Sequence, residues 1–275
     1  MVNNRTTPIH IVASDLDGTL LQPNHQLSPF TQQTLKQLHD SGYIFVFATG
    51  RHHVDVAGIR EIAAIPAYMV TSNGARVHDP QDNLIFSHNV PEHLVQSIID
   101  MVKQEPDINI NLYRNDDWLI NKKDEALKRF NSSSGFSFQL FDVDNAPTTG
   151  ISKLFFTHPN QSHEYLAKFE KQFNERFGDQ VNVAFSTPEC LEIMAGDVSK
   201  GEALEVVADK LGYTLDNCIA FGDGMNDVEM LSMVGKGLVM GTSHQRVFSA
   251  LPENEVIGSN TQDAVAHYLK SNLLD

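Results

Sequence analysis

The stretch IVASDLDGTLL, residues 11–21, places two aspartates directly after an apolar run. The run predicts a buried strand, and Gly18 with Thr19 predicts that the chain turns away at its end. The aspartates are Asp15 and Asp17, whose carboxylates would repel each other and lose hydration in such a place. The stretch therefore predicts a site at the end of a strand that has to accommodate like charges.

The DLDGT segment has two plainer interpretations. Asp and Gly are common turn residues, so the segment could simply end a strand. A calcium-binding loop of the EF-hand type is excluded by its spacing. Such a loop needs Gly at its sixth position and Glu at its twelfth, where counting from Asp15 gives Leu20 and Gln26.

Outward from this stretch, strand and helix patterns alternate. Residues 9–14 predict a strand, and Ser28 and Pro29 predict the start of a helix that stops at Gly42. The run YIFVFATG (43–50) predicts a strand covered on both faces, as in parallel sheets. A helix to about Ala64 and a strand at 67–73 follow, and 74–89 predicts a hairpin.

The pattern changes over residues 88–188. Helices are expected at 91–104, near 123–130 and from Ser162 to Phe177. The strands between them alternate apolar and polar residues, which predicts an antiparallel sheet with helices on one face.

After residue 189 the first pattern returns, with helices between the runs CIAFGDG, KGLVMG and EVIGS. The sequence thus predicts an α/β protein with a Rossmann-like, doubly wound parallel-sheet core that is interrupted by an inserted α+β cap domain. The expected bounds are 1–87 and 189–275 for the discontinuous core and 88–188 for the cap.

Composition limits the function. The 275 residues are 41% hydrophobic and 20% charged, as in ordinary globular proteins, and their formal net charge is -15. That charge argues against binding nucleic acid or an anionic membrane surface. Cys190 and Cys218 predict thiols rather than a disulfide or a zinc site, and we expect a cytoplasmic protein because no signal peptide or long apolar segment is evident.

Three of the predicted parallel strands end in polar segments: DLD after residue 14, TGR at 49–51 and GDGMND at 222–227. Ligands of doubly wound sheets bind outside the carboxyl ends of the strands, so these segments are expected to meet in one crevice. A fourth segment, DVSKGEALE (197–205), predicts a helix with Ser199 and Glu202 spaced as a capping box. Lys200 then lies in the first helical turn, where a cation is favourable if it faces an anion.

The carboxylates of this crevice exceed its cations. Asp15, Asp17, Asp223 and Asp227 cannot all ionise together without compensation. A hard divalent cation with oxygen ligands supplies that compensation, and Mg²⁺ fits better than zinc because no Cys or His cluster is present. The remaining polar groups are donors: Thr49, the Gly50 N–H, Lys200 and Asn226. Metal, carboxylates and donors together predict a phosphoryl-group site, where an aspartate can act as nucleophile and a second acid can move protons.

The four segments DLDGT, FATGR, Lys200 and GDGMND resemble the four motifs of haloacid dehalogenase-like phosphatases. The inserted cap resembles the Cof-type subgroup, and FATGRHHVDV, TSNGARVHD and CIAFGDGMND resemble its members described as pyridoxal phosphate and sugar phosphate phosphatases. The resemblance covers essentially the whole chain.

The resemblance implies a role for each matching residue. Asp15 is the nucleophile and a magnesium ligand, Asp17 is the acid and base and gives its backbone carbonyl to the metal, and Asp223 is a further metal ligand. It also implies that Asp227 supports the metal or Lys200. The residues that it places on phosphate or substrate are the Leu16 N–H, Thr49, Gly50, Lys200 and Asn226.

Other residues near the predicted crevice have two interpretations. Arg51, His52 and His53 follow the phosphate-binding segment and could line the substrate entrance, where Arg51 is expected. Their other interpretation, favoured for His53, is that they cap the start of the next helix or lie in solvent. Asn73 also ends a strand and is expected on the substrate side, although Asn-Gly is a strong turn signal. In the cap, Tyr113, Arg114 and Trp118 could hold the organic part of a phosphate ester, but aromatic residues at such spacings are more often sheet core.

The sequence thus predicts a Mg²⁺-dependent phosphomonoester hydrolase of small cytosolic metabolites, with pyridoxal phosphate and sugar phosphates implied by the resemblance. A phosphomutase using the same aspartyl phosphate is the alternative enzyme. A signalling domain that accepts a phosphoryl group on aspartate is the non-enzymatic alternative, but it would not need Asp17 as a second acid or a cap of this size.

Overall fold

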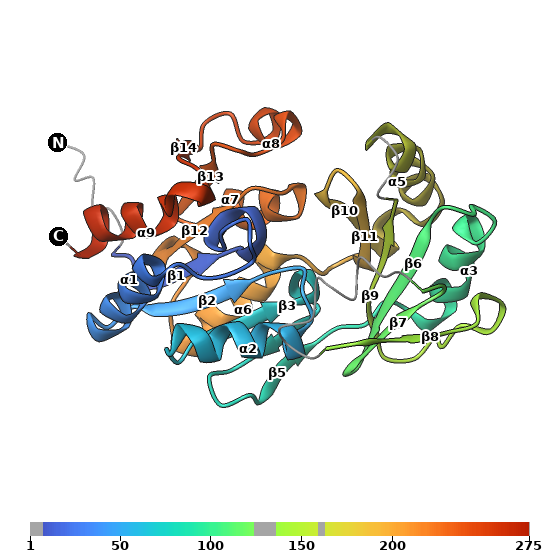
Figure 1. The fold of residues 1–275 in the computed structure, drawn as a ribbon, viewed down its shortest axis with the longest axis horizontal. Helices are drawn as coiled ribbons and strands as arrows, with labels where there is room; N and C mark the ends of the chain where they lie inside the picture. Colours follow the sequence, from blue (N-terminus) through green and yellow to red (C-terminus); the bar gives the residue numbers. More distant parts are fainter. Residues whose placement is uncertain (1–7, 124–135, 159–162, 275) are drawn as a thin grey trace.

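Two β-sheets lie side by side in this protein. The computed structural model describes residues 8–123, 136–158 and 163–274. Within them, an eight-stranded sheet and a six-stranded sheet stand next to each other along the long axis of the molecule (Figure 1).

The larger sheet contains the predicted parallel strands. Its order is β14-β13-β12-β1-β2-β3-β4-β5, and the first six strands are parallel. The strands are β1 (Ile11–Ser14), β2 (Ile44–Ala48), β3 (Tyr68–Thr71), β4 (Arg76–His78), β5 (Leu84–Ser87), β12 (Cys218–Gly222), β13 (Lys236–Met240) and β14 (Glu255–Ile257). β4 and β5 form the expected antiparallel hairpin at one edge. The doubly wound α/β core is confirmed.

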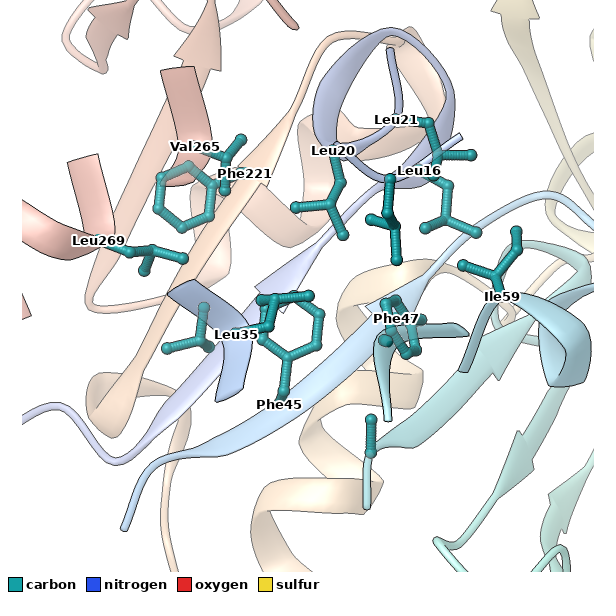
Figure 2. Close-up of a cluster of buried hydrophobic side chains, with 14 of the residues drawn as sticks. Leu16, Leu20, Leu21, Leu35, Phe45, Phe47, Ile59, Phe221, Val265 and Leu269 are labelled. Atoms are coloured by element: carbon teal, nitrogen blue, oxygen red, sulfur yellow. The ribbon is translucent and has the colours of Figure 1, made fainter. Parts of the chain in front are cut away.

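Helices cover both faces of this sheet, which explains the continuous apolar runs of its strands. One face packs against α1 (Pro29–Asp40), α2 (His53–Ala63) and α9 (Ala264–Leu269). Figure 2 shows this cluster, in which Leu35, Ile59 and Leu269 from these helices meet Phe45, Phe47 and Phe221 from the strands. The other face packs against α6 (Lys200–Leu211), α7 (Val228–Met233) and α8 (Gln245–Ala250).

The smaller sheet has the order β10-β11-β9-β6-β7-β8. Its strands are β6 (Asn109–Arg114), β7 (Asp117–Ile120), β8 (Phe138–Leu140), β9 (Ile151–Thr157), β10 (Val181–Thr187) and β11 (Cys190–Ala195). All neighbours are antiparallel except β7 and β8, which are parallel. The helix expected near 123–130 falls almost wholly outside the described residues.

Two helices cover one face of the smaller sheet, as predicted. α3 (Glu92–Val102) and α5 (His163–Phe177) pack on the alternate strand residues, including Leu112, Leu154 and Phe156. The residues between them, such as Lys153 and Phe155, therefore point to the opposite face, because side chains alternate along a strand.

The chain returns to the larger sheet later than expected. We expected the core to resume at residue 189, but β11 pairs with both β9 and β10, so the smaller sheet continues to Ala195. The short connection at 188–189 joins β10 and β11 as neighbouring antiparallel strands, which need only a tight turn. The division of the chain into two domains stays a prediction. Among the described residues, no helix combines the length and the apolar character needed to cross a membrane.

Candidate active site

The polar ends of three neighbouring strands meet at one edge of the larger sheet. β1 lies between β12 and β2 in a parallel arrangement, so the segments after all three strands leave the sheet at the same end. A cavity of about 460 Å³ lies there. The predicted site residues that line it are Asp15, Asp17, Thr49, Gly50, Arg51, Asp223 and Asn226.

Lys200 joins the segments after β1 and β12. Its Nζ donates to Oδ1 of Asp15 at 2.7 Å and to Oδ1 of Asp227 at 2.6 Å, and its side chain is fully buried. Ser199 begins α6 by accepting the Glu202 N–H, as the capping-box spacing predicts. The expectation that Lys200 faces an anion is confirmed, because it contacts two carboxylates.

Hydrogen bonds from the segments after β1 and β12 position Asp223 and Asp227. Thr19 donates its hydroxyl to Oδ1 of Asp223 at 2.6 Å, while Oδ2 of Asp227 accepts the N–H groups of Asp223 and Gly224 at 2.9 Å each. Gly18 has φ of +80°, and a Cβ there would lie 2.4 Å from Oδ2 of Asp223. The DGT turn thus needs glycine both for its left-handed conformation and for the close approach of this carboxylate.

The charge at this end of the cavity is unbalanced. Asp15, Asp223 and Asp227 each offer one oxygen within 4.8 Å of the others, and Lys200 is the cation between two of them. Burial, followed by the charge of Asp227, raises the pKa of Asp223 to about 7. Burial also raises the pKa of Asp15 well above its usual value, against the attraction of Lys200. Carboxylates crowded in this way are the ligand set that a hard divalent cation prefers, so these residues fit Mg²⁺.

Lys200 itself stays charged. Burial alone would lower the pKa of its ammonium group, but Asp15 and Asp227 outweigh burial and raise that pKa above its ordinary value. Lys200 is thus a fixed positive charge beside the nucleophile candidate, not a proton donor or acceptor at neutral pH.

Asp17 pairs with Arg51 and His25 and is not part of the carboxylate cluster of Asp15, Asp223 and Asp227. Arg51 donates to both of its oxygens at 2.6 Å, and Nδ1 of His25 lies 2.8 Å from Oδ1. These hydrogen bonds outweigh burial and hold the pKa of Asp17 below its usual value. Arg51 also donates to Asp55 at 2.7 Å. Arg51 was expected on the substrate side; it does line the cavity, but its guanidinium pairs with Asp17 and Asp55.

Three of the predicted phosphate-binding residues, Thr49, Gly50 and Asn226, line the cavity together with Asp223. Thr49 accepts the Arg51 N–H through Oγ1, so its own hydroxyl proton is available to a ligand. Nδ2 of Asn226 donates to Oδ1 of Asn73 at 3.0 Å. Asn73 is buried and supports Asn226 from behind the cavity wall. The side chain of Leu16 packs in the core, and the phosphate contact expected of its N–H stays a prediction.

The smaller sheet supplies the roof of the cavity. Its contributors include Tyr113 and Trp118, which the sequence analysis considered, and Lys153, Phe155 and Glu192, which it missed. All of them lie on the sheet face that α3 and α5 leave uncovered. A signal was present in the sequence, because Lys153 and Glu192 are charged residues inside the apolar runs ISKLFF and CLEIMA.

The remaining candidates from the sequence are the cap residues Tyr113, Arg114 and Trp118, the histidine before α2, and the two cysteines. Tyr113 and Trp118 pack with Phe136 and Phe155 and also line the cavity, whereas Arg114 donates to the Thr149 carbonyl and is not among the lining residues. His52 caps α2 by accepting the Val54 N–H, as its position predicts. Both cysteines are free thiols.

Comparison with known proteins identifies the family. The model of the haloacid dehalogenase-like hydrolases matches residues 12–269. A Haemophilus influenzae protein named "Putative phosphatase" is 42% identical over 265 residues, which are 96% of this chain and 97% of that protein. An HMP-PP phosphatase of Yersinia pestis is 39% identical over 259 residues, 94% of this chain and 93% of that protein.

A solved structure supports the same fold. A haloacid dehalogenase-like hydrolase from B. subtilis superposes with a TM-score of 0.83 at 24% identity, covering 97% of this chain and 100% of that one. The chain belongs to the haloacid dehalogenase-like hydrolases and is a phosphatase.

Proposed function

We propose that this enzyme is a Mg²⁺-dependent phosphomonoesterase of small phosphorylated metabolites in the cytoplasm, with Asp15 as its nucleophile. The observation that carries the proposal is the unbalanced cluster of Asp15, Asp223 and Asp227 around the single ammonium group of Lys200. The cluster lies beside a row of donors at the carboxyl ends of the parallel strands, where a phosphoryl group finds both charge compensation and hydrogen bonds.

The metal is assigned to the carboxylate cluster. Asp15 and Asp223 would hold Mg²⁺ together with the backbone carbonyl of Asp17, and Asp227 would support it. When bound, the ion neutralises the charge that the substrate phosphate brings to these carboxylates.

Asp15 carries out the first step. A carboxylate oxygen of Asp15 attacks phosphorus, the bond from phosphorus to the ester oxygen breaks, and an aspartyl phosphate forms while the leaving oxygen takes a proton from Asp17. Lys200 keeps the attacking carboxylate oriented through its 2.7 Å hydrogen bond. The Thr49 hydroxyl, the Gly50 N–H and the Asn226 amide are the proposed donors to the phosphoryl oxygens.

Asp17 completes the second step. It accepts a proton from water as the water attacks phosphorus, and inorganic phosphate leaves Asp15. The pairing with Arg51 and His25 keeps Asp17 ionised, which is the form needed for this step. To donate a proton in the first step, Asp17 has to be released from Arg51 and to take up a proton from solvent. An incoming phosphate is an anion that can draw the guanidinium away.

The roof of the cavity favours small ring-bearing substrates. Tyr113, Trp118 and Phe155 give it an aromatic surface, and a cavity of about 460 Å³ accommodates a metabolite but not a folded protein. Pyridoxal phosphate and sugar phosphates are our proposed substrates, and HMP-PP is a further candidate because relatives carry that name.

A phosphate-release panel tests the proposal. Pyridoxal phosphate, hexose phosphates, HMP-PP and a nucleotide are incubated with Mg²⁺ and either the wild type or Asp15→Asn. We expect the wild type alone to release phosphate from at least one of the small esters. Release from none of them, or equal release by the variant, contradicts the proposal, and an isomer formed with little free phosphate indicates the phosphomutase alternative.

A further inference from the structure

A buried ion pair in the roof of the cavity has no part in the chemistry proposed above. Nζ of Lys153 on β9 lies 2.6 Å from Oε1 of Glu192 on β11, and the two side chains are only 3% and 4% exposed. β9 and β11 are antiparallel neighbours, and Glu192 is opposite Phe155. Lys153 is therefore its diagonal neighbour on the same face, the face that points toward the cavity.

Hydrogen bonds run from this pair to the edge of the larger sheet. Nζ of Lys153 donates to the Gly50 carbonyl at 2.6 Å, in the segment after β2. Oε2 of Glu192 accepts from Nδ2 of Asn73 at 2.5 Å, in the segment after β3. Oδ1 of Asn73 in turn accepts from Asn226, in the segment after β12. Gly50 and Asn226, two proposed phosphate donors, are thus tied to the smaller sheet from both ends of one network.

The side chains of Asn73 and Glu192 pack closely against the backbone of Gly50. A Cβ at Gly50 would lie 2.9 Å from Oδ1 of Asn73 and 3.3 Å from Oε2 of Glu192. The Gly50 backbone therefore rests directly on the two side chains that connect it to Asn226. A shift of Glu192 would be transmitted to both donors, because close-packed groups move together.

The electrostatics of the pair favour a single arrangement. Each charge is buried, and a buried charge is tolerated only when it is paired and hydrogen-bonded. The ammonium group of Lys153 also lies 4.9 Å and 4.7 Å from the ring centroids of Tyr113 and Phe155, within the range of cation–π attraction. Glu192 has its two oxygens taken by Lys153 and Asn73.

We propose that Lys153 and Glu192 are positioning residues, which hold the Gly50 N–H and the Asn226 amide in the geometry that binds the phosphoryl group. This inference rests on the proposed function, since it assigns these donors to phosphate. It adds that the phosphate-binding end of the cavity is complete only when the smaller sheet is in contact with the larger one.

The test compares Lys153→Met, Glu192→Gln and the double variant with the wild type, all with Mg²⁺. Two measurements are made: kcat and KM for two phosphate esters with different leaving groups, and the affinity for inorganic phosphate, followed as a competitive inhibitor and by its effect on the melting temperature. Inorganic phosphate has no leaving group, so it reports only on the phosphate-binding end.

We expect each single variant to lose about tenfold in phosphate affinity and in kcat, as is typical when a group that orients a ligand-binding residue is removed. The loss should be the same for both esters. The double variant should resemble the single variants instead of multiplying their effects, because the two residues act as one unit. It also removes both buried charges together, so it keeps the test valid if a single variant fails to fold.

Lys171→Met and Glu175→Gln are the matched controls. This pair makes the same kind of ion pair on α5 of the same region, at 3.7 Å, but its side chains are 76% and 64% exposed. We expect these variants to behave like the wild type.

Three results would overturn the inference. They are phosphate affinity within about twofold of the wild type in the folded double variant, a loss confined to one ester, and single-variant losses that multiply in the double variant. A wild type that binds inorganic phosphate but hydrolyses no ester contradicts the proposed function instead, and the phosphate affinities of the variants still decide the positioning role.

Discussion

Two buried lysines lie at the same cavity and differ in the charge around them, Lys153 as a lining residue and Lys200 through its contact with the lining residue Asp15. Lys200, at the end of the larger sheet, contacts Asp15 and Asp227 and lies in a cluster that also includes Asp223. Lys153, in the smaller sheet, pairs with Glu192 and donates to a carbonyl. The wall around Lys200, with Asp15, Asp223 and Asp227, has an excess of negative charge, and we call it the unbalanced wall. The wall around Lys153 and Glu192 has equal charges of both signs, and we call it the balanced wall.

This difference separates the chemistry from its support. An excess of buried carboxylates is costly unless a cation or a substrate compensates it, and such sites are where reactions are carried out. A balanced buried pair needs nothing further and holds its neighbours in place. The predictions below change one wall or the other and follow the expected size of the effect.

The largest effect is expected from the proposed nucleophile. Asp15→Asn removes the carboxylate that we propose attacks phosphorus while it keeps an acceptor for Lys200, so kcat/KM should fall by more than about a thousandfold. Steady-state phosphate release with Mg²⁺ measures it. A kcat/KM of the variant within about tenfold of that of the wild type would contradict the role assigned to Asp15.

Lys200→Ala is expected to cost about a hundredfold or more in kcat, because one charged stabiliser of the nucleophile and phosphate is lost. The same substitution on the balanced wall, Lys153→Ala, should cost only about tenfold. Equal losses in the two variants would show that the two lysines do not differ in function.

The unbalanced wall also predicts how metal binding depends on pH. The pKa of Asp223 is raised from 3.8 to about 7 in the metal-free folded protein. Between these two pH values the folded protein therefore holds a proton on Asp223 that the unfolded chain has released. The contribution of the Asp223 carboxyl to the free energy of unfolding is fully present below its ordinary pKa and is lost as the pH rises through about 7. Because Mg²⁺ binds the ionised carboxylates, its stabilising effect should grow between about pH 5 and about pH 8.

Melting temperatures with and without Mg²⁺ at both pH values measure this effect. Asp223→Asn should remove most of the Mg²⁺ effect and stabilise the metal-free protein at the higher pH, since one repelling charge is gone. A Mg²⁺ shift that is equal at both pH values, or unchanged in the variant, contradicts the assignment of the metal to this cluster.

The smallest change tests the contact between the walls. Gly50→Ala places a Cβ 2.9 Å from Oδ1 of Asn73, which is too close for the present packing, so Asn73 or the Gly50 backbone has to shift. We expect a rise in KM and a weaker inhibition by phosphate of about threefold to tenfold, with little change in melting temperature. Gly58→Ala, on α2 with nothing within 4 Å, is the control and should leave both values unchanged.

The sequence predicts the unbalanced wall well. Asp15, Thr49 and Asp223 each follow an apolar strand directly, and parallel strands deliver their carboxyl ends to one edge, so local pattern is sufficient to bring them together. Lys200 is found the same way, since a cation in the first turn of a helix is unusual unless it faces an anion.

The balanced wall could not be predicted in this way. Lys153 and Glu192 meet because β9 and β11 pair in one register, which pattern alone does not fix over such a separation. The late return to the larger sheet was missed for the same reason, because β11 is as apolar as the core strands. The pairing of Arg51 with Asp17 depends on a side-chain conformation that no sequence pattern encodes.

The central claim is that the unbalanced wall forms an aspartyl phosphate on Asp15, and trapping that species tests it most directly. The Asp17→Asn variant lacks the base for hydrolysis and also the acid for the first step, so the trapping ester is one that the wild type hydrolyses and whose leaving group departs without a proton, such as a nitrophenyl phosphate. With Mg²⁺ and this ester the variant should accumulate the phosphoryl-enzyme, which is then quenched with acid. The account predicts that peptide mass spectrometry finds one added phosphoryl group on the peptide that contains Asp15, and none in the Asp15→Asn/Asp17→Asn double variant. A phosphoryl group on another residue, or turnover by the wild type with no phosphoryl-enzyme in the trapping variant, would contradict it.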